Sequence, residues 1–449
     1  MATPLVGIHA FGYALPHLIL PIETLALHRG IDVKKLQNGL GLRSISLPDG
    51  YQDAVTFATE AVARLVEEQK VDLSLIDRIY VGTESQVDSA KPIGSFVVGL
   101  IENQFGADCL QHCDVVDLNF ACIGAVDALE NCLDYVRLHP DKMAIVLATD
   151  VARYDLESGG EYTQGAGAIA LLIKSNPDLI AFGSKRGVSI AHEFDFFKPR
   201  RPLPAALLSE ELQRTYPEKE WLVFRDQPVF DGHYSQTCYK NRMVAAYKHF
   251  CSQKPADFTD WRTWDGIIMH LPYAYQARRT FFELIWEEQF AETYTDAALA
   301  AQAKKEFIAS EAYQSVVARC IAPTELGSSI WGNLYTGSLF LGLISYFNEY
   351  AETSQDCAGQ KLGFLAYGSG SKAKVFQGIV QPNWHNKVTT RRLKSVEQLL
   401  QKLDFETYLA LYRGDAKKVS NPPKGSWALT DIETKNPVQL WARRYKMIE

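Results

Sequence analysis

A cysteine in the first third of the chain is the residue best placed for nucleophilic chemistry. Cys122 lies in the stretch NFACIGA (119–125), between a short apolar run and a helix-like segment that opens at Gly124. The free amide groups and partial positive charge of a helix N-terminus stabilise a thiolate, lower a cysteine pKa below about 8.5 and supply donors for an oxyanion. This setting is compatible with a nucleophile. The alternative, a small core cysteine at a tight helix start, stays open on this pattern alone.

A carboxylate and an imidazole follow two other predicted strands. Glu84 comes after the β-branched run Ile79–Thr83, at the carboxyl edge of a sheet, where open α/β folds place their sites and where a carboxylate suits general acid or base work. His270 follows Gly266–Met269 and can donate to a carbonyl oxygen or accept a proton. The competing interpretations are a glutamate that caps a helix at 91–101 and a structural histidine. Spacing alone does not join these residues to the cysteine.

The glycine-rich stretch SGGEYTQGAG (158–167) is a further candidate for ligand contact. It has no lysine of the kind found in phosphate-binding P-loops, and it does not match GxGxxG after a strand, so nucleotide binding of either type is disfavoured. Two interpretations remain open: a tight turn before the strand Ala168–Ile173, or a backbone surface along which an extended, thin ligand lies.

The composition is that of a globular, enzyme-sized protein. The 449 residues include 53 acidic and 46 basic side chains, which gives a net charge of −7, and 47% of the residues are apolar. These values exclude disorder for most of the length. The mild acidity, without a basic face, argues against nucleic acid as a partner.

Cysteine usage and hydropathy exclude several further classes. The eight cysteines are sparse and show no CxxC pair, which disfavours a disulfide scaffold or a metal site. No apolar stretch approaches the roughly 18 residues needed to cross a bilayer, and the N-terminus has no basic region followed by a cleavable apolar core. We therefore expect a cytoplasmic protein without a membrane partner.

The elements that must position the candidate residues alternate between helices and strands. Helical spacing of apolar residues predicts a long amphipathic helix at Asp53–Lys70, and glycines end two short helices at Glu23–Gly30 and Val33–Gly39. Four short apolar runs are predicted to be buried strands: Ile79–Thr83, Val115–Leu118, Met143–Thr149 and Ala168–Ile173. Buried strands separated by helices indicate an α/β fold with a mostly parallel sheet.

The second half repeats a pattern of the first. Gly124 opens an apolar helix that is followed by the strand MAIVLAT, and Gly337 opens GSLFLGLISYF, which is followed by LGFLAYGSG. This order suits a duplicated α/β half, although any buried helix before a buried strand would look similar. Between the halves, the polar stretch Lys198–Gln227 is predicted to be a surface excursion. In the tail, a single helix is expected at Ser395–Leu411.

Seven segments in order resemble the hydroxymethylglutaryl-CoA synthase family of the thiolase superfamily. They are GTESQVDSAKPIG, FACIGA, TDVARYDLESGGEYTQGAGAIALL, VFDGHYS, MHLPY, GNLYTGSLFLGL and AYGSG. The resemblance implies a thiolase-like fold, with two duplicated halves in a five-layered αβαβα arrangement that usually pairs as a homodimer. The halves are then 1–175, with Glu84 and Cys122, and 176–449, with His270 and a surface insertion near 198–227.

The resemblance also implies a reaction. Acetyl-CoA acylates the cysteine, the methyl carbon of the acetyl-enzyme attacks the ketone of acetoacetyl-CoA, and hydrolysis releases 3-hydroxy-3-methylglutaryl-CoA. By resemblance, Cys122 is the nucleophile, Glu84 handles protons during condensation, and His270 orients the acetoacetyl thioester. No metal or redox cofactor is implied. The implied ligand-contacting residues are Asp32, Lys35, Gly159, Thr163, Ser235, Asn333 and Ser369.

Two departures from the family pattern concern positive charge. The family commonly has HxPFxK with a second basic residue four positions later, which would pair with CoA phosphates; here the first position is Tyr275 and the second is Arg279. Arg279 therefore joins the predicted CoA-binding residues. The stretch 198–227 is longer than usual and brings Lys198, Arg200 and Arg201, which would replace the missing phosphate contact or touch an acidic partner.

Three functions stay in view at this point. A branch of the family uses acyl chains tethered to an acyl carrier protein in polyketide β-branching. The glycine-rich stretch is more similar to the enzymes of the mevalonate pathway, which use free CoA thioesters, and free acetoacetyl-CoA is preferred. The third interpretation, a catalytically silent binding partner with a thiolase fold, is disfavoured by the three chemistry-bearing residues.

Overall fold

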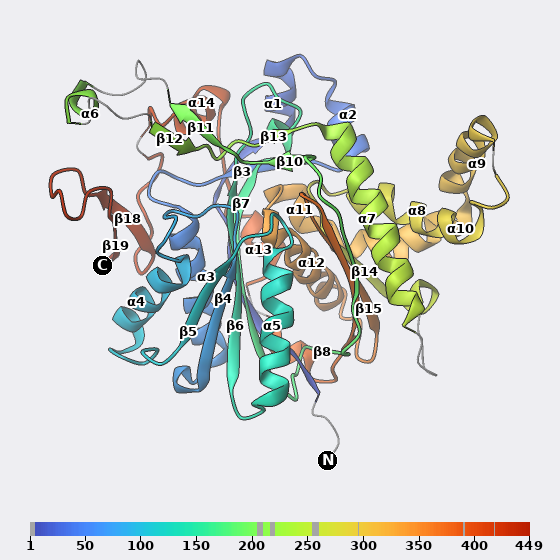
Figure 1. Cartoon of the computed structure of the whole chain (residues 1–449), viewed down its shortest axis with the longest axis horizontal. Helices are drawn as coiled ribbons and strands as arrows, with labels where there is room; N and C mark the ends of the chain where they lie inside the picture. The colour runs from blue at the N-terminus through green and yellow to red at the C-terminus, as the bar shows by residue number, and fades with distance from the viewer. Residues whose placement is uncertain are drawn as a thin grey trace.

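A single mixed sheet runs through the molecule (Figure 1). The computed structural model describes residues 5–203, 210–215, 221–253, 260–294, 296–388, 391–416 and 418–449. Within them the sheet has ten strands in the order β14-β15-β16-β8-β1-β7-β6-β4-β5, with β9 paired beside β16.

The N-terminal half of the sheet carries helices on both faces. Its strands are β1 (Val6–Ala14), β7 (Gly165–Ser175), β6 (Met143–Ala152), β4 (Ile76–Gly82) and β5 (Asp114–Leu118). Its helices are α3 (Ala54–Gln69), α4 (Ile93–Phe105) and α5 (Gly124–Leu138). The helix predicted at Asp53–Lys70 is confirmed as α3. The Asp53 carboxylate accepts hydrogen bonds from the backbone amides of Val55 and Thr56, which satisfies free donors of the first turn.

The C-terminal half repeats this plan. Its strands are β9 (Gly187–Ile190), β16 (Lys372–Val380), β15 (Lys361–Gly368) and β14 (Gly266–Met269), with helices α7 (Gly232–Ser252), α8 (Gln276–Gln289) and α12 (Ser338–Glu352). The pairs β9/β16 and β16/β15 are antiparallel and β15/β14 is parallel; in the same way, β1/β7 and β7/β6 are antiparallel and β6/β4 is parallel. The predicted duplication is confirmed, and β5 is an additional strand at the N-terminal edge.

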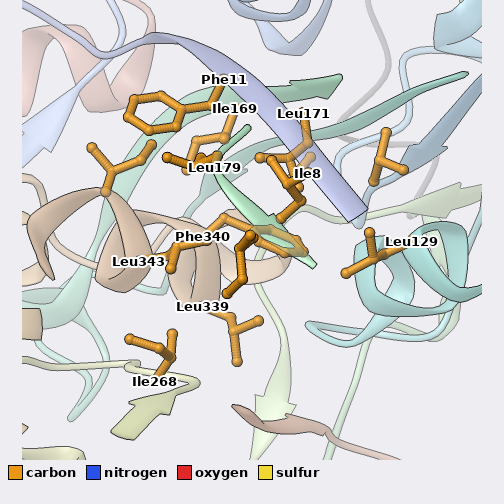
Figure 2. Packing of buried hydrophobic residues seen from close by; sticks show 14 of the residues in the cluster. Ile8, Phe11, Leu129, Ile169, Leu171, Leu179, Ile268, Leu339, Phe340 and Leu343 are labelled. Carbon is orange, nitrogen blue, oxygen red and sulfur yellow. The ribbon is translucent and has the colours of Figure 1, made fainter. Parts of the chain in front are cut away.

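Two helices lie between the halves of the sheet and form the middle of the core. Buried side chains of α5 and α12 belong to one apolar cluster with those of β1, β7 and β14, and Figure 2 shows Leu129 of α5, Phe340 of α12 and Ile169 of β7 among them. A second cluster joins α3 and α4 to the outer face of the N-terminal strands, and a third joins α7 and α8 to the outer face of the C-terminal strands. The five-layered arrangement is therefore confirmed.

The short strand β8 (Ile180–Phe182) joins the two halves by pairing with both β1 and β16. The strands of both halves thus belong to one continuous sheet, whose inner face packs on α5 and α12. The division of the chain at residue 175 stays a prediction.

A smaller unit covers the carboxyl edge of the main sheet. It consists of β2 (Leu18–Pro21), β3 (Ser44–Leu47), β17 (Gln401–Lys402), α1 (Ile22–Arg29), α2 (Val33–Leu40) and α14 (Phe405–Arg413). Helix α2 continues through Gly39 to Leu40, and the next residue, Gly41, caps it with a left-handed φ of +73°. The single tail helix expected at Ser395–Leu411 is wrong, because β17 interrupts it to pair with β2.

The stretch 198–227 forms structure of its own. β10 (Phe196–Phe197) pairs with β13 (Val229–Phe230), β11 (Arg200–Leu203) pairs with β12 (Trp221–Phe224), and α6 is a short helix (Glu210–Thr215). Residues 204–209 and 216–220 of this stretch lie outside the described part of the chain.

Three elements lie at the periphery: α9 (Ala297–Ala309), α10 (Glu311–Val316) and the hairpin of β18 (Trp427–Ile432) with β19 (Arg443–Met447). The short helices α11 (Leu326–Trp331) and α13 (Leu393–Glu397) instead contribute buried side chains to the central cluster. Helices α9 and α10 project to the right in Figure 1. Among the helices described, none has the length and apolarity that a membrane crossing requires.

Candidate active site

Two of the candidate residues, Glu84 and Cys122, meet because parallel strands deliver their carboxyl ends to one edge of the sheet. β4 is parallel to both β5 and β6, with Gly82 opposite Leu118 and Ala148. The segments that follow β4 and β5 therefore bring Glu84 and Cys122 side by side. In the other half, β14 is parallel to β15, which places His270 after one strand and Ser369 after its neighbour.

The loop that carries Cys122 is held between the two halves by glycines. A Cβ atom on Gly82 would lie 2.1 Å from the backbone nitrogen of Ala125, so only glycine lets the start of α5 approach β4 this closely. From the other half, a Cβ on Gly368 would lie 2.8 Å from the carbonyl oxygen of Phe120. The residue before the nucleophile, Ala121, has a φ of +41°, an uncommon conformation that the surrounding contacts impose.

Cys122 and Glu84 form a direct pair. The Cys122 sulfur donates to Glu84 Oε1 at 3.0 Å, and the Glu84 side chain is only 5% exposed. Burial, followed by the nearby charge of Glu84, raises the pKa of the Cys122 thiol well above its ordinary value. The lowered thiol pKa expected from the helix start is therefore wrong: a buried position beside a carboxylate outweighs the partial charge of a helix N-terminus.

Glu84 is fixed at both its backbone and its side chain. Its amide donates to Asp150 Oδ1 at 2.7 Å, and its carboxylate Oε2 lies 3.5 Å from the Lys198 ammonium nitrogen.

The start of α4 is capped by Asp117 and not by Glu84. The Asp117 carboxylate accepts from the amides of Ile93 at 2.6 Å and Gly94 at 3.2 Å. The interpretation of Glu84 as a helix cap is excluded.

Asp150 is a site residue that the sequence reasoning did not single out. It is fully buried near the end of β6 and accepts from the Glu84 amide and from the backbone amide and hydroxyl of Thr336, the last at 2.5 Å. Burial and then the charge of Glu84 raise the pKa of Asp150 above its usual range. The sequence does contain a signal for this residue: Asp150 directly follows the apolar run Met143–Thr149, in the same way that Glu84 follows Ile79–Thr83.

His270 is buried in the C-terminal half. Its Nδ1 has no hydrogen-bond partner among the described residues, and its backbone carbonyl accepts from the Tyr239 hydroxyl at 2.9 Å. Burial lowers the pKa of His270 to about 3, so the imidazole is neutral near pH 7. Burial first, and then the charges of Tyr273 and Cys122, raise the pKa of Tyr239, which places Tyr239 within electrostatic range of the nucleophile.

Because the His270 imidazole is buried in its neutral form, we expect the free energy of unfolding to depend on pH. The pKa of His270 falls from an ordinary 6.5 to about 3 on folding, so the unfolded chain binds the proton more readily. The contribution of this pKa shift to the free energy of unfolding is complete above pH 6.5. It is lost as the pH falls toward 3, by about 1.4 kcal/mol per pH unit. In chemical denaturation between about pH 6.5 and 4.5, His270→Asn should lose this slope relative to the native chain.

An exposed histidine provides the control for this measurement. His139→Asn, at the end of α5, should keep the native slope, because His139 lies on the surface. An unchanged slope in His270→Asn would contradict the burial argument.

A cavity of about 610 Å³ opens beside Glu84. Its lining includes Glu84, Asn119, Lys198 and Ser369 together with residues of the insertion, Phe224 to Asp226. The insertion is thus not only a surface excursion, because Lys198 and residues 224–226 form a wall of the candidate site. This volume is in the range typical of small-molecule sites.

Two predicted ligand residues meet around a buried carboxylate. Asp195 is fully buried and accepts from the Tyr367 hydroxyl at 2.7 Å and the Gly370 amide at 2.8 Å. Ser235, at the start of α7, has its hydroxyl 3.5 Å from the same carboxylate, and Ser369 precedes Gly370. The two predicted serines therefore lie on neighbouring segments of the C-terminal half. Asp195 itself was not predicted.

Three other predicted ligand residues lie in or beside the glycine-rich stretch. The Asn333 backbone nitrogen donates to the Thr163 carbonyl oxygen at 2.9 Å, and both residues are buried. Gly159 is exposed on the same stretch. Glu161 anchors the stretch, because its buried carboxylate accepts from Arg29 at 2.7 and 2.9 Å. The stretch thus forms a short 3-10 helix (Glu161–Thr163) that leads into β7, as the turn interpretation predicts, and its role as a surface for a ligand stays a prediction.

The remaining predicted residues lie together on an outer corner. Asp32 caps α2 by accepting from the Lys34 amide at 3.0 Å, and Lys35 is exposed on the same helix. The exposed Arg279, on α8, approaches α2 so closely that a Cβ on Gly39 would lie 3.5 Å from its guanidinium. The structure therefore gathers two positive charges, of Lys35 and Arg279, at the corner where α2 meets α8.

Tyr275 and the basic side chains that lie near it or in the insertion have partners within the chain. The Arg278 guanidinium stacks over the Tyr275 ring at 4.0 Å and forms two hydrogen bonds of 2.6 Å with Glu325. In the insertion, Arg200 lies over the Phe224 ring at 4.9 Å. Lys198 turns inward, with its ammonium nitrogen 3.5 Å from Glu84 Oε2, and its role as a replacement phosphate contact stays a prediction.

Known proteins share this arrangement along nearly the whole chain. The family model described as "Hydroxymethylglutaryl-coenzyme A synthase N terminal" matches residues 3–178, and its C-terminal counterpart matches residues 180–411. A hydroxymethylglutaryl-CoA synthase of Haloferax volcanii is 29% identical over 427 residues, which cover 90% of each chain. The enzyme of that name from Enterococcus faecalis is 28% identical over 411 residues, or 92% of this chain and 91% of the relative.

Solved structures agree with the sequence comparisons. MvaS in complex with 3-hydroxy-3-methylglutaryl coenzyme A superposes with a TM-score of 0.82 at 30% identity, covering 99% of this chain and 100% of that one. The hydroxymethylglutaryl synthase of the curacin biosynthetic pathway has a TM-score of 0.78 at 19% identity, covering 99% of this chain and 100% of that one, a likeness that shows the fold alone. With both halves matched and a cysteine–glutamate pair at their junction, the chain belongs to the hydroxymethylglutaryl-coenzyme A synthase family of acyl-transferring enzymes.

Proposed function

We propose that this enzyme condenses acetyl-CoA with acetoacetyl-CoA to give 3-hydroxy-3-methylglutaryl-CoA, through an acetyl group carried on Cys122. The observation that carries the proposal is the 3.0 Å contact between the Cys122 sulfur and Glu84 at the carboxyl edge of the sheet. It places a proton-transferring carboxylate next to the sulfur on which the acetyl group would be carried.

Each residue of the site has a distinct task in this proposal. The Cys122 sulfur attacks the acetyl carbonyl, and CoA leaves as the thiol. Glu84 then takes a proton from the methyl group of the acetyl thioester, and the new carbanion attacks the ketone of acetoacetyl-CoA. The protonated Glu84 returns the proton to the tertiary alkoxide, and water cleaves the bond to Cys122.

His270 is assigned to the acceptor. Because burial keeps its imidazole neutral near pH 7, one ring nitrogen is able to donate a hydrogen bond to the thioester oxygen of acetoacetyl-CoA. The proposal includes no metal or redox cofactor, because every bond change is an acyl transfer, a proton transfer, a carbon–carbon addition or a hydrolysis.

Free acetoacetyl-CoA is the proposed acceptor. The structure of MvaS, at 30% identity, contains 3-hydroxy-3-methylglutaryl coenzyme A as a free thioester, whereas a relative crystallised with a donor acyl carrier protein is 19% identical. Mass spectrometry of the acetylated enzyme after mixing with acetoacetyl-CoA or with an acetoacetyl carrier protein tests this choice. Rapid turnover with the free thioester is expected, and a strong preference for the carrier-bound acceptor would overturn it.

Positive charge at the outer corner gives a prediction for CoA binding. Arg279→Gln should raise the KM for both CoA thioesters about fivefold at low salt, because an exposed charge pair contributes up to about 1 kcal/mol. The effect should shrink in high salt, since such pairs are screened over about 10 Å at 0.1 M. Steady-state kinetics at two salt concentrations measure it.

A matched arginine separates this effect from a general loss of charge. Arg262 pairs with Glu288 near the opposite end of α8, so Arg262→Gln should leave the KM unchanged. An equal, salt-independent change in both variants would contradict a phosphate contact at Arg279. The other assigned CoA contacts, at Asp32, Lys35, Gly159, Thr163, Ser235, Asn333 and Ser369, form part of the proposal.

A homodimer is the proposed assembly. Strand β5 ends the main sheet, and its outer edge pairs with no strand among the described residues. An unpaired edge strand is a template for association with a second chain. Light scattering should give twice the mass of one chain, and a monomer at micromolar concentration would contradict it. The cytoplasmic location expected from the sequence stays a prediction.

A further inference from the structure

Lys198 reaches the catalytic pair from the insertion. Its ammonium nitrogen lies 3.5 Å from Glu84 Oε2 and donates to the Glu84 carbonyl oxygen at 3.3 Å. One side chain thus contacts both the backbone and the carboxylate of the same residue. The opposite carboxylate oxygen, Oε1, is the one that accepts from the Cys122 sulfur.

The surroundings of Lys198 favour a role inside the site over one at its mouth. The side chain is only 15% exposed, and its ammonium lies 4.4 Å from the centre of the Tyr335 ring. A lysine held against a carboxylate and an aromatic face loses the mobility and solvation of a surface cation. An anion outside the cavity would have to compete with Glu84 for this charge.

We propose that Lys198 is a positioning residue for the reaction: its ammonium group balances the negative charge of the Glu84 carboxylate and directs Oε1 toward the Cys122 sulfur. The role rests on the proposed function, in which Glu84 removes a proton from the acetyl group on that sulfur. It explains why the insertion reaches the catalytic pair at this residue.

The charges around Glu84 give the proposal its physical reason. The groups that face this carboxylate are Lys198 from the insertion, Cys122 before α5, Asp150 on β6, and the rings of Tyr154 and Tyr335. Lys198 is the cation among them, and its charge opposes the rise in the pKa of Cys122 and of Asp150 that burial causes. Without Lys198, the buried Glu84 carboxylate would face Asp150 and the Cys122 sulfur with no cation beside it.

Exchange of the methyl hydrogens of the acetyl-enzyme tests the role without an acceptor. Enzyme acetylated at Cys122 is placed in deuterated buffer at a series of pH values, and deuterium in the acetylated peptide is followed by mass spectrometry. In Lys198→Met the pH at which exchange accelerates should rise by about one unit, so that exchange is roughly tenfold slower at pH values below the native midpoint. Lys198→Arg should restore most of the native profile.

A surface pair of the same chemistry supplies the control. Lys248 and Glu287 lie 3.0 Å apart on α7 and α8, and Lys248→Met should leave the exchange profile unchanged. In steady-state assays below the native midpoint of the exchange profile, Lys198→Met should lower kcat about tenfold while the KM for both thioesters stays within about twofold. A raised, salt-sensitive KM with a native exchange profile would overturn the proposal in favour of a phosphate contact.

The outcomes separate this role from the proposed function. Native enzyme that acetylates and exchanges but does not condense would contradict the proposed function alone. Native condensation with an unchanged exchange profile in Lys198→Met would contradict the role of Lys198 alone. Thermal melting checks the fold of each variant, and Lys198→Gln takes the place of Lys198→Met if the latter does not fold.

Discussion

Replacing Cys122 by serine should abolish acetylation of the protein by acetyl-CoA and lower turnover by on the order of 10⁴-fold or more, as expected when a covalent nucleophile is lost. The reason is positional: the sulfur of Cys122 touches Glu84 at 3.0 Å and borders the start of α5. Intact-mass spectrometry after incubation with acetyl-CoA should show one added acetyl group on the native chain and none on Cys122→Ser.

Another cysteine makes the control for this result. Cys109 is also partly buried but lies on the loop after α4, away from the carboxyl ends of β4 and β5. Cys109→Ser should therefore acetylate and turn over like the native enzyme. Labelling of a cysteine other than Cys122, together with an active Cys122→Ser, would refute the assignment.

Glu84→Ala should separate the two halves of the reaction. Acetylation of Cys122 should persist, because the charge of Glu84 contributes to the raised pKa of the thiol and its removal makes the thiol easier to ionise. Condensation should fall by about 10²- to 10⁴-fold, the usual contribution of a positioned acid or base. Rapid-quench measurement of acetyl-enzyme and of condensed product resolves the two steps.

The surface pair again provides the matched variant. Glu287→Ala removes a carboxylate that pairs with Lys248 outside the cavity, and it should leave both steps unchanged. Failed acetylation with normal condensation of a preformed acetyl-enzyme in Glu84→Ala would reverse the proposed role.

Local patterns were enough to place the elements that carry the chemistry. The helical spacing at 53–70 and the buried runs at 79–83 and 143–149 correspond to α3, β4 and β6, because periodicity and burial are properties of neighbouring residues. The same kind of pattern failed at 395–411, where pairing of β17 with β2 breaks a segment that is helical by composition. Pairing between strands that lie far apart along the chain is not visible in the pattern of neighbouring residues.

The catalytic residues show the same difference between what the local sequence predicts and what the fold decides. Residue types and the family resemblance were sufficient to name Cys122, Glu84 and His270, yet their spacing of 38 and 148 residues contains no distance between them. The 3.0 Å contact of Cys122 with Glu84 arises only because β4 and β5 are parallel neighbours whose carboxyl ends coincide. The direction of the thiol pKa was misjudged for the same reason: it depends on burial and on a carboxylate distant in sequence.

The chain by itself therefore determined which groups are available for catalysis and which elements they follow. The tertiary structure decided what surrounds them. Asp150 and Lys198, the two charged neighbours of Glu84, come from β6 and from the insertion, and neither has a local signature that separates it from a surface charge. The physical reason is that electrostatic interactions depend on separation in space and on burial, and folding sets both by bringing distant segments together.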